Sequence, residues 1–340
     1  MEGISVLLFK IYISYGLKNL LTYLGGKLMR KAVYFFCTDY ERDEVAPRVL
    51  NYLKENYDLK LVDFKFANRD VYEYHDDRGN LFSFVETDKV LSYDYDLYIP
   101  LLNKYFKDYD VAGVVNWHGG KNAPDKILTV HSTGDVVGKI FAPSNPVYLR
   151  NLLLAIEENR VKSSLDDFTT MTEATHWTGT IQGQDINLID KYQVPIFDIE
   201  IGSTLESWKN PIAESVLANS LFRVFDDDIK PELKDIKVLL CTGGMHFEET
   251  FSNVIINTEK PVSIGHILSN QWMVQGEYDK EENYQYLKKC VDSISMKVDG
   301  IVIHDNLKSA YKNVVKKLGE ELGVPVFKHK KLKKPSDLPI

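Results

Sequence analysis

Short apolar runs alternate with segments of helical periodicity along most of the chain. Runs of strand length end in polar or glycine-containing turns, and they occupy residues 31–38, 111–116, 126–130, 195–201, 237–241 and 298–305. Between them, apolar residues recur at helical spacing in residues 42–56, 143–159, 210–225, 284–295 and 309–322. Alternation of strands and helices is typical of a sheet that carries helices on both faces. We therefore predict an α/β fold of three layers with a mainly parallel sheet.

The first 28 residues differ from this pattern. They are apolar, but Lys10 and Lys18 interrupt them, so they lack the uninterrupted span of about 18 apolar residues that a membrane helix needs. Met29 closely precedes the first predicted strand. Deleting this segment is expected to leave folding and activity intact. We interpret residues 1–28 as an extension or a mis-assigned start, residues 29–326 as a single large α/β domain, and residues 327–340 as a basic C-terminal tail.

Charge and cysteine usage limit the partners and the compartment of the protein. The net charge of −8 means that no global field attracts nucleic acid, so such a partner needs a local basic patch. Cys37, Cys241 and Cys290 are far apart and form no C-x-x-C pair, which fits a reducing cytoplasm. The tail offers one basic patch, for which a solvated charge run is the alternative interpretation. Its lysines are Lys328, Lys330, Lys331, Lys333 and Lys334.

Histidines recur at the ends of the predicted strands. His118, His131 and His246 each follow an apolar run and lie near glycines. His176 lies with Glu173 in the polar segment 170–176. Neutral imidazole is a common ligand of zinc, and carboxylates often complete such sites. The pattern therefore indicates a metal-centred hydrolytic site, although the loops of a parallel sheet converge on one edge whatever their role, and a buried core position is the alternative for each histidine.

The strand at residues 195–201 contributes two acids to this picture. Asp198 and Glu200 share one face of the strand because side chains alternate with a period of two. A carboxylate inside an apolar strand is costly to bury unless it meets a cation or hydrogen-bond donors. Glu200 is therefore a candidate ligand or base. The remaining histidines are His266 beside a glycine, His75 and His329, which we expect at the surface, and His304, for which we expect a structural role.

Five short motifs in order carry a resemblance to a known family. They are L-T-V-H-S-T-G-D (128–135), T-E-A-T-H (172–176), E-I-G-S-T-L-E-S-W (200–208), G-G-M-H-F (243–247) and G-H-I (265–267). Together the set resembles the archaeal- and plant-type D-aminoacyl-tRNA deacylases. The resemblance implies a phosphorylase/hydrolase-like α/β fold and a zinc-dependent hydrolase. It also implies the reaction, hydrolysis of the ester of D-aminoacyl-tRNA to free D-amino acid and tRNA, which is a step of translation quality control.

Within that resemblance, the site residues fall into two groups. His118, His131, His176, His246 and Glu200 are the expected Zn²⁺ ligands. The expected catalytic residues are His176, Glu173, Thr175 and His246, with Thr175 and the backbone around Gly243-Gly244 as donors to an oxyanion. The implied partner is aminoacylated tRNA, bound at its D-aminoacyl 3′ end.

The sequence departs from the family pattern beside two of these histidines. The family typically continues the T-H of residues 175–176 with a second histidine, Gly and Pro, where this chain has Trp177-Thr178-Gly179. The family usually follows its G-G-x-H-Y with a small residue, proline and a basic residue, whereas Phe247-Glu248-Glu249 follow here. Two alternatives therefore remain open: a zinc-dependent hydrolase of the same fold acting on another ester or amide, and a non-catalytic relative that binds tRNA.

Overall fold

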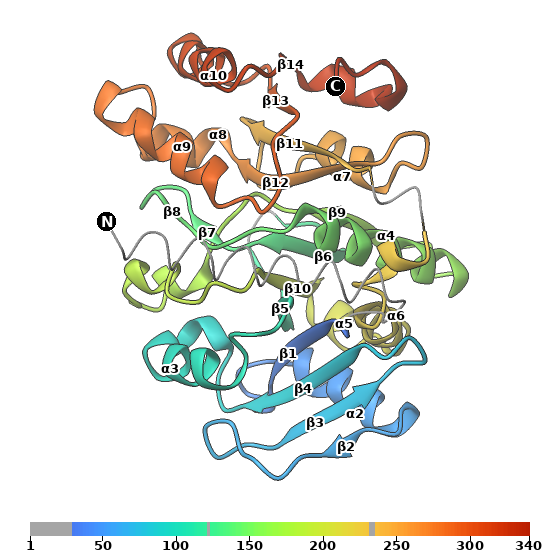
Figure 1. The fold of residues 1–340 in the computed structure, drawn as a ribbon. Helices are drawn as coiled ribbons and strands as arrows, with labels where there is room; N and C mark the ends of the chain where they lie inside the picture. The colour runs from blue at the N-terminus through green and yellow to red at the C-terminus, as the bar shows by residue number, and fades with distance from the viewer. Residues whose placement is uncertain (1–28, 121–122, 231–234) are drawn as a thin grey trace, which may run out of the picture.

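The computed structural model describes residues 29–120, 123–230 and 235–340, and two sheets dominate them (Figure 1). The interpretation of residues 1–28 lies outside the described residues. The first sheet has the spatial order β2 (Lys60–Leu61), β3 (Val71–His75), β4 (Leu81–Thr87), β1 (Lys31–Cys37), β5 (Val111–Trp117), β10 (Ile196–Ser203), β6 (Lys126–Ser132) and β9 (Thr169–Thr172). The second has the order β12 (Val262–Leu268), β11 (Lys237–Thr242), β13 (Gly300–Ile303) and β14 (Val326–Lys328), and a small ribbon pairs β7 (Gly134–Asp135) with β8 (Ile140–Phe141).

Strand direction differs between the two sheets. In the first sheet β4, β1, β5 and β10 run parallel, whereas β6 is antiparallel to β10 and β3 is antiparallel to β4. The described strands of the second sheet all pair in parallel. The expected α/β architecture is confirmed, and the antiparallel β6 is a feature that the pattern of apolar runs did not predict.

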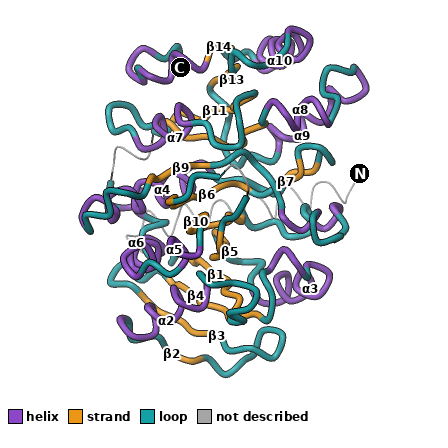
Figure 2. The backbone as a smooth tube through the Cα atoms, turned by 180° about the vertical axis from the view of Figure 1, so that it is seen from behind, coloured by secondary structure: helices purple, strands orange, loops and turns teal. Residues whose placement is uncertain are grey.

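Helices cover both faces of each sheet (Figures 1 and 2). The even-numbered apolar side chains of β1 pack with α2 and the odd-numbered ones with α3, as the period of two requires. In the second sheet, alternate residues of β11 likewise face α7 on one side and α9 and α10 on the other. The helices are α2 (Ala46–Asn56), α3 (Tyr95–Tyr105), α4 (Pro146–Lys162), α5 (Leu205–Trp208), α6 (Pro211–Leu221), α7 (Glu249–Ile256), α8 (Asn270–Gln275), α9 (Tyr284–Asp292) and α10 (Ser309–Leu322).

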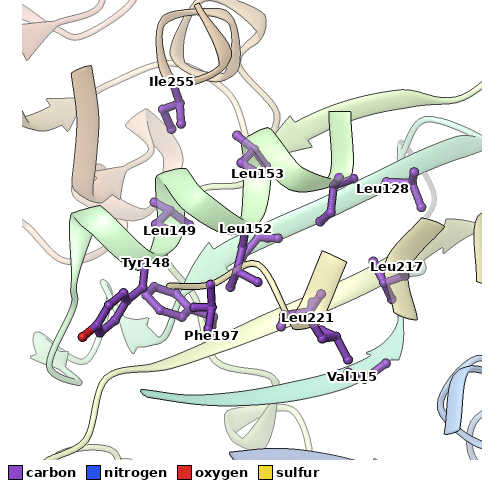
Figure 3. Packing of buried hydrophobic residues seen from close by; sticks show 14 of the residues in the cluster. Val115, Leu128, Tyr148, Leu149, Leu152, Leu153, Phe197, Leu217, Leu221 and Ile255 are labelled. Carbon is purple, nitrogen blue, oxygen red and sulfur yellow. The ribbon is translucent and has the colours of Figure 1, made fainter. Parts of the chain in front are cut away.

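Helix α4 joins the two sheets through a shared core. Its side chains from Tyr148 to Ile156 are all buried, whichever way they point. This follows from its position: Figure 3 shows Leu152 and Leu153 lying between Phe197 of β10 and Ile255 of α7. A helix that is apolar on all sides needs protein on all sides. The cluster that contains α4 therefore includes strands of both sheets.

A single buried arginine stabilises this junction. Arg150 of α4 is only 2% exposed, and it donates to the backbone carbonyls of Val262 at 2.8 Å and Asn257 at 2.7 Å, and to that of Ile255. It therefore ties α4 to the end of α7 and the start of β12. Burial without a carboxylate partner lowers the pKa of Arg150 to about 10.

Replacing Arg150 with methionine is expected to destabilise the protein strongly. Methionine fills a similar volume but leaves three buried carbonyls without a donor, which costs about 1–3 kcal/mol for each unsatisfied group. We expect the free energy of unfolding to fall by about 3 kcal/mol or more, measured by urea titration. The control is Lys162→Met on the exposed last turn of the same helix, which should change stability by about 0.5 kcal/mol or less.

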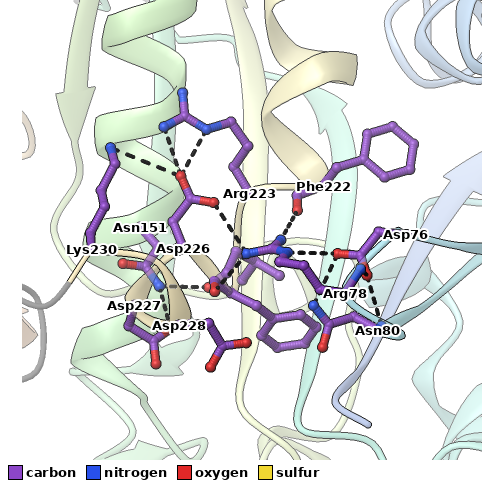
Figure 4. A network of polar contacts seen from close by, with 12 residues as sticks. Asp76, Arg78, Asn80, Asn151, Phe222, Arg223, Asp226, Asp227, Asp228 and Lys230 are labelled. Atoms are coloured by element: carbon purple, nitrogen blue, oxygen red, sulfur yellow. Dashed lines mark hydrogen bonds and ion pairs between the residues drawn. The ribbon is translucent and has the colours of Figure 1, made fainter. Parts of the chain in front are cut away.

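A polar network fixes the edge of the first sheet against α4 (Figure 4). The turn after β3 has Gly79 at φ +81°, which explains the glycine in this position. Arg78 of that turn donates to the carbonyl of Phe225 at 3.1 Å and lies 3.7 Å from Asp226. Asn151 of α4 donates to Asp227 at 2.9 Å. The network ties the turn between β3 and β4 to α4, so we assign it a role in the fold.

The predicted basic tail is part of the packed structure. Its start pairs with β13 as strand β14, and Leu332 and Leu338 are buried. Lys330 forms an ion pair of 2.7 Å with Asp305. Residues 327–340 therefore pack on the second sheet, and the division into a domain at 29–326 and a basic tail stays a prediction. None of the described helices has the length and hydropathy needed to cross a membrane.

Candidate active site

The polar segment after β9 lies where the two sheets meet. Thr175 donates its backbone N–H to the carbonyl of Ile267, and Ala174 donates to that of His246, so both bonds reach the second sheet and its loops. On the other side, His176 bridges to Thr133 just after β6 of the first sheet. The segment that carries Glu173 and His176 is therefore held from both sides.

Glu173 is the centre of the site. Its carboxylate is 1% exposed, and Oε2 lies 2.6 Å from His246 Nε2 and 3.3 Å from His118 Nε2. Burial acts to raise the pKa of Glu173, but the bonds from the two imidazoles and the charge of His131 outweigh it and hold that pKa well below its ordinary value. The other oxygen, Oε1, is buried and has no protein partner. Glu173 is thus ionised, and its Oε1 is free to accept a hydrogen bond or to bind a cation.

His118 reaches Glu173 from the end of β5. Its backbone N–H donates to the carbonyl of Ile201 on the neighbouring β10, which continues the ladder by one residue. Its Nδ1 lies 2.9 Å from the hydroxyl of Ser203, the last residue of β10. A partner on Nδ1 fixes the ring orientation and leaves Nε2 for the site, as is typical of metal-binding histidines.

His131 and His176 form the second half of the cluster. Their rings stack with centroids 3.9 Å apart, and the ring of His176 lies 4.9 Å from that of His246. The Nδ1–H of His176 donates to the carbonyl of Ala174 at 2.9 Å, and His131 Nδ1 lies 3.2 Å from that of Ser132. Burial, and then the charge of His131, lowers the pKa of His176 well below its ordinary value. His176 is therefore neutral, with a free lone pair on Nε2.

His131 differs from its predicted position. It lies inside β6 and not in a loop after it, and it is completely buried on the face of the sheet. Because β6 is antiparallel to β10, His131 lies directly opposite Asp198 in the register. Its Nε2 is 3.8 Å from Asp198 and 3.9 Å from Glu200, which confirms that these two acids share a face. Burial lowers the pKa of His131, but Glu200, Glu173 and Asp198 outweigh this and raise it to about 10.

Two groups among the described residues have the spacing of metal ligands. One comprises His118, Glu173 and His246, and the other His131, Glu173 and His176, with the ligand atoms of each group within 4.8 Å of one another. The unpartnered Glu173 Oε1 and His131 Nε2 belong to these groups. Imidazole nitrogens with one carboxylate are a donor set that suits zinc, so the residues present fit this ion. Glu200, an expected ligand, belongs to neither group.

A cavity of about 530 Å³ opens onto the cluster. Besides His118, His176, His246 and Glu200, its wall is largely aromatic. The indole of Trp272 packs against His176 and His246, with centroids 5.7 Å and 5.3 Å away. A wall of this kind presents flat apolar surface to a ligand. Its aromatic residues are Tyr93, Trp117, Phe247 and Trp272.

Several predicted site residues do not face this cavity with free groups. The hydroxyl of Thr175 accepts from the backbone of Ile267 at 3.0 Å and lies 3.1 Å from His266 Nδ1. The N–H groups of Gly243 and Gly244 are already bonded, to Leu268 and to Asn306. Their part in an oxyanion hole thus stays a prediction without geometric support. The five lysines of the tail, likewise, lie in the segment that packs on the second sheet, and not among the residues lining the cavity.

Two further histidines are buried, and for His329 the expected surface position was wrong. His266 is buried in β12, where its two ring nitrogens face Thr175 and Ser293 at 3.1 Å and 3.0 Å, so it is a satisfied core residue. His329 is buried and not at the surface, with its ring 3.8 Å from that of His304. This pair lies outside the two ligand groups, which agrees with the structural role expected for His304.

Asp43 is a residue that the sequence did not single out. It lies just before α2, and its Oδ1 accepts from the backbone of Val45 and Ala46 at 2.8 Å and 2.9 Å, while Oδ2 is buried without a partner. Burial raises the pKa of Asp43 to about 7, and Glu200 contributes to the shift. The only sequence signal was an aspartate in the first turn of the helix predicted at residues 42–56, where acids are common.

Replacing Asp43 with asparagine is expected to change how stability depends on pH. The folded pKa is raised, so the folded protein binds a proton that the unfolded chain releases above about 4, and wild-type stability falls as pH rises from about 4 to about 7. The asparagine amide does not titrate, so the variant should gain on the order of 3 kcal/mol relative to wild type across that range, measured by urea titration. Asp77→Asn, an exposed position, should gain nothing.

Comparison with known proteins places this site in a family. The model of the D-aminoacyl-tRNA deacylase family matches residues 105–327, more than half of the chain. The D-aminoacyl-tRNA deacylase of Pyrococcus horikoshii is 26% identical over 290 residues, covering 84% of this chain and 96% of the relative. That of Archaeoglobus fulgidus is 29% identical over 290 residues, covering 83% and 93%.

A solved structure agrees with this assignment over almost the whole fold. The crystal structure of a conserved protein of unknown function, AF0625, superposes with a TM-score of 0.69 and 26% sequence identity, covering 90% of this chain and 97% of that one. The matched family region includes every histidine of the two ligand groups, Glu173 and both acids of β10. The chain belongs to the D-aminoacyl-tRNA deacylase family.

Proposed function

We propose that the protein hydrolyses the ester bond of D-aminoacyl-tRNA and releases the free D-amino acid and tRNA. The observation that carries the proposal is the convergence of four histidines on the buried, ionised Glu173, with three of them, His118, His176 and His246, lining one cavity. Relatives that bear the name of this activity match the chain over most of its length. The cluster supplies one requirement of ester hydrolysis, a group that accepts a proton from water.

We also propose that Zn²⁺ is held by His118, Glu173 and His246. The support is the unpartnered Glu173 Oε1 and the ligand spacing of the three side chains. When bound, such an ion lowers the pKa of a water molecule and polarises a carbonyl. Binding requires that His246 gives up the proton that Nε2 now donates to Glu173. Ser203 orients His118 for this role through Nδ1.

His176 is suited to accept a proton during the reaction. It is neutral, its Nδ1–H is held by the carbonyl of Ala174, and Nε2 keeps its lone pair. It lines the cavity, beside Trp272. The stacked His131, whose pKa the acids of β10 raise, disfavours a charge on His176 and so keeps His176 in the neutral form that can accept a proton. We assign proton transfer to His176 on these grounds.

The substitution of Trp177 for a second histidine does not dismantle the cluster. Trp177 is buried and packs against Tyr95 with centroids 5.2 Å apart, on the side of α3. The four remaining histidines still surround Glu173. This arrangement supports a catalytic protein over a non-catalytic relative that binds tRNA.

One observation favours the second candidate, a hydrolase of another ester or amide. Glu248 and Glu249 lie next to the groove that continues from His246, and their charge disfavours the phosphates of tRNA. If tRNA is the substrate, positively charged side chains elsewhere on the protein must contact its phosphates. We keep the lysines of residues 328–334 as the proposed site of that contact.

Deacylation of D- and L-tyrosyl-tRNA and of a small D-tyrosyl ester tests both candidates. We expect hydrolysis of D-tyrosyl-tRNA, at least about tenfold slower hydrolysis of the L-form, and loss of activity after treatment with a zinc chelator. Rapid hydrolysis of the small ester without preference for charged tRNA would support the second candidate. Binding of tRNA without hydrolysis, by protein that contains no zinc, would support the non-catalytic alternative.

A further inference from the structure

Glu200 is the one acid of the cavity wall that the proposed reaction leaves without a role. It is 2% exposed, it lines the cavity, and it belongs to neither ligand group. Its Oε2 is buried and has no hydrogen-bond partner. The other oxygen, Oε1, is 3.9 Å from His131 Nε2, which is too far for a hydrogen bond. His131 supplies a positive charge nearby, but no protein donor reaches Oε2. A buried oxygen left without a donor is costly, so it indicates a donating ligand that the protein alone does not supply.

The surroundings of Glu200 limit what that ligand can be. Asp198 and Asp43 are the other acids near it, and the aromatic Tyr93 faces the same cavity. Two acids and a π surface favour a compact cation with several N–H donors. The acyl part of an aminoacyl ester carries one such group, the protonated α-amine, which is two bonds away from the ester carbonyl. If the ester lies at Glu173 and the histidines, its amine is within reach of the same cavity wall.

We infer that Glu200 receives the α-ammonium group of the aminoacyl ester, so that the enzyme acts on esters with a free amine and discriminates against N-acylated ones. This inference rests on the proposed function. It assigns Glu200 to substrate recognition in place of metal binding. A contact with Glu200 would hold a second substituent of the chiral carbon, the amine, besides the carbonyl. With two substituents held, the D- and L-forms direct their side chains to different walls of the cavity.

The neighbouring Asp198 offers a matched control. It lies on the same face of β10 two residues before Glu200, it is equally buried, and it is 3.8 Å from the same nitrogen of His131. Unlike Glu200, it is not among the residues that line the cavity, and it accepts from Asn116 at 3.2 Å. A variant of either acid removes a carboxyl group next to His131, but only a variant of Glu200 removes one that lines the cavity.

The experiment compares kcat/KM for D-tyrosyl-tRNA and N-acetyl-D-tyrosyl-tRNA in wild type, Glu200→Gln and Asp198→Asn. We expect wild type to favour the free amine by about 10- to 100-fold, the size of a charged hydrogen bond. Glu200→Gln should reduce this ratio to near one, mainly through slower hydrolysis of the free-amine substrate. Asp198→Asn should keep the wild-type ratio even if both rates fall.

Three outcomes would overturn the inference: a wild-type ratio near one, a preference for the free amine that survives in Glu200→Gln, or the same loss of preference in Asp198→Asn. Hydrolysis of neither substrate by wild type contradicts the proposed function itself, and the inference with it. If Glu200→Gln is too slow to assay, calorimetric binding of the non-hydrolysable 3′-D-tyrosylamido-adenosine and its N-acetyl derivative gives the same ratio from affinities.

Discussion

Replacing Glu173 with glutamine is expected to lower kcat/KM for D-aminoacyl-tRNA by about 10³-fold or more while the protein stays folded. The amide keeps the shape of the side chain but removes the charge that His118 and His246 both face. The variant lacks both a ligand of the proposed Zn²⁺ and the negative charge that His118 and His246 face. Each loss affects the transition state. The measurement is single-turnover deacylation, together with the zinc content of the purified variant.

Glu249→Gln is the matched control for this substitution. Glu249 is exposed at the start of α7, close to the same groove, and it has no contact with the histidines. Its replacement should not lower kcat/KM, and it should raise it if the charge of Glu249 opposes the phosphates of tRNA. A Glu173→Gln variant with nearly wild-type activity would show that the two histidines work without this carboxylate and would contradict the site as described.

The folding pattern was predictable where each element could be recognised from its own residues. The strand at residues 195–201 and the helix after Asn210-Pro211 are found within a few residues of the expected positions. Asn210 caps that helix by accepting from Ile212 and Ala213, which is the local reason why the helix begins there. Propensity and capping are local, so the sequence reveals them.

Pairing between distant strands was not predictable in the same way. The direction of β6 depends on its neighbour β10, which follows it by more than 60 residues. One signal was available: residues 118–125 between β5 and β6 are too few for the crossover helix that parallel strands need. The division of the strands into two sheets was not predictable either. It depends on α4 packing between the sheets, and no local feature of the sequence marks it.

The site was predictable in its members but not in its connections. The sequence identified four histidines and Glu173, and the structure brings them together. It did not identify Ser203 as the partner of His118, because the two are 85 residues apart and meet only through the pairing of β5 with β10. The sequence also did not distinguish Glu200 from a metal ligand, since ligand geometry depends on side-chain positions that spacing along one strand does not fix.

Replacing His246 with alanine is expected to remove bound zinc and to lower hydrolysis at least about 100-fold. His246 is the most exposed member of its ligand group, so alanine there disturbs packing less than at His118 or Glu173. A folded variant without zinc would separate loss of metal from loss of fold, which Glu173→Gln alone cannot do. The exposed His75→Ala should keep zinc and activity. Full zinc content with lost activity would instead assign the ion to His131, Glu173 and His176, and would leave His246 with proton transfer or substrate binding.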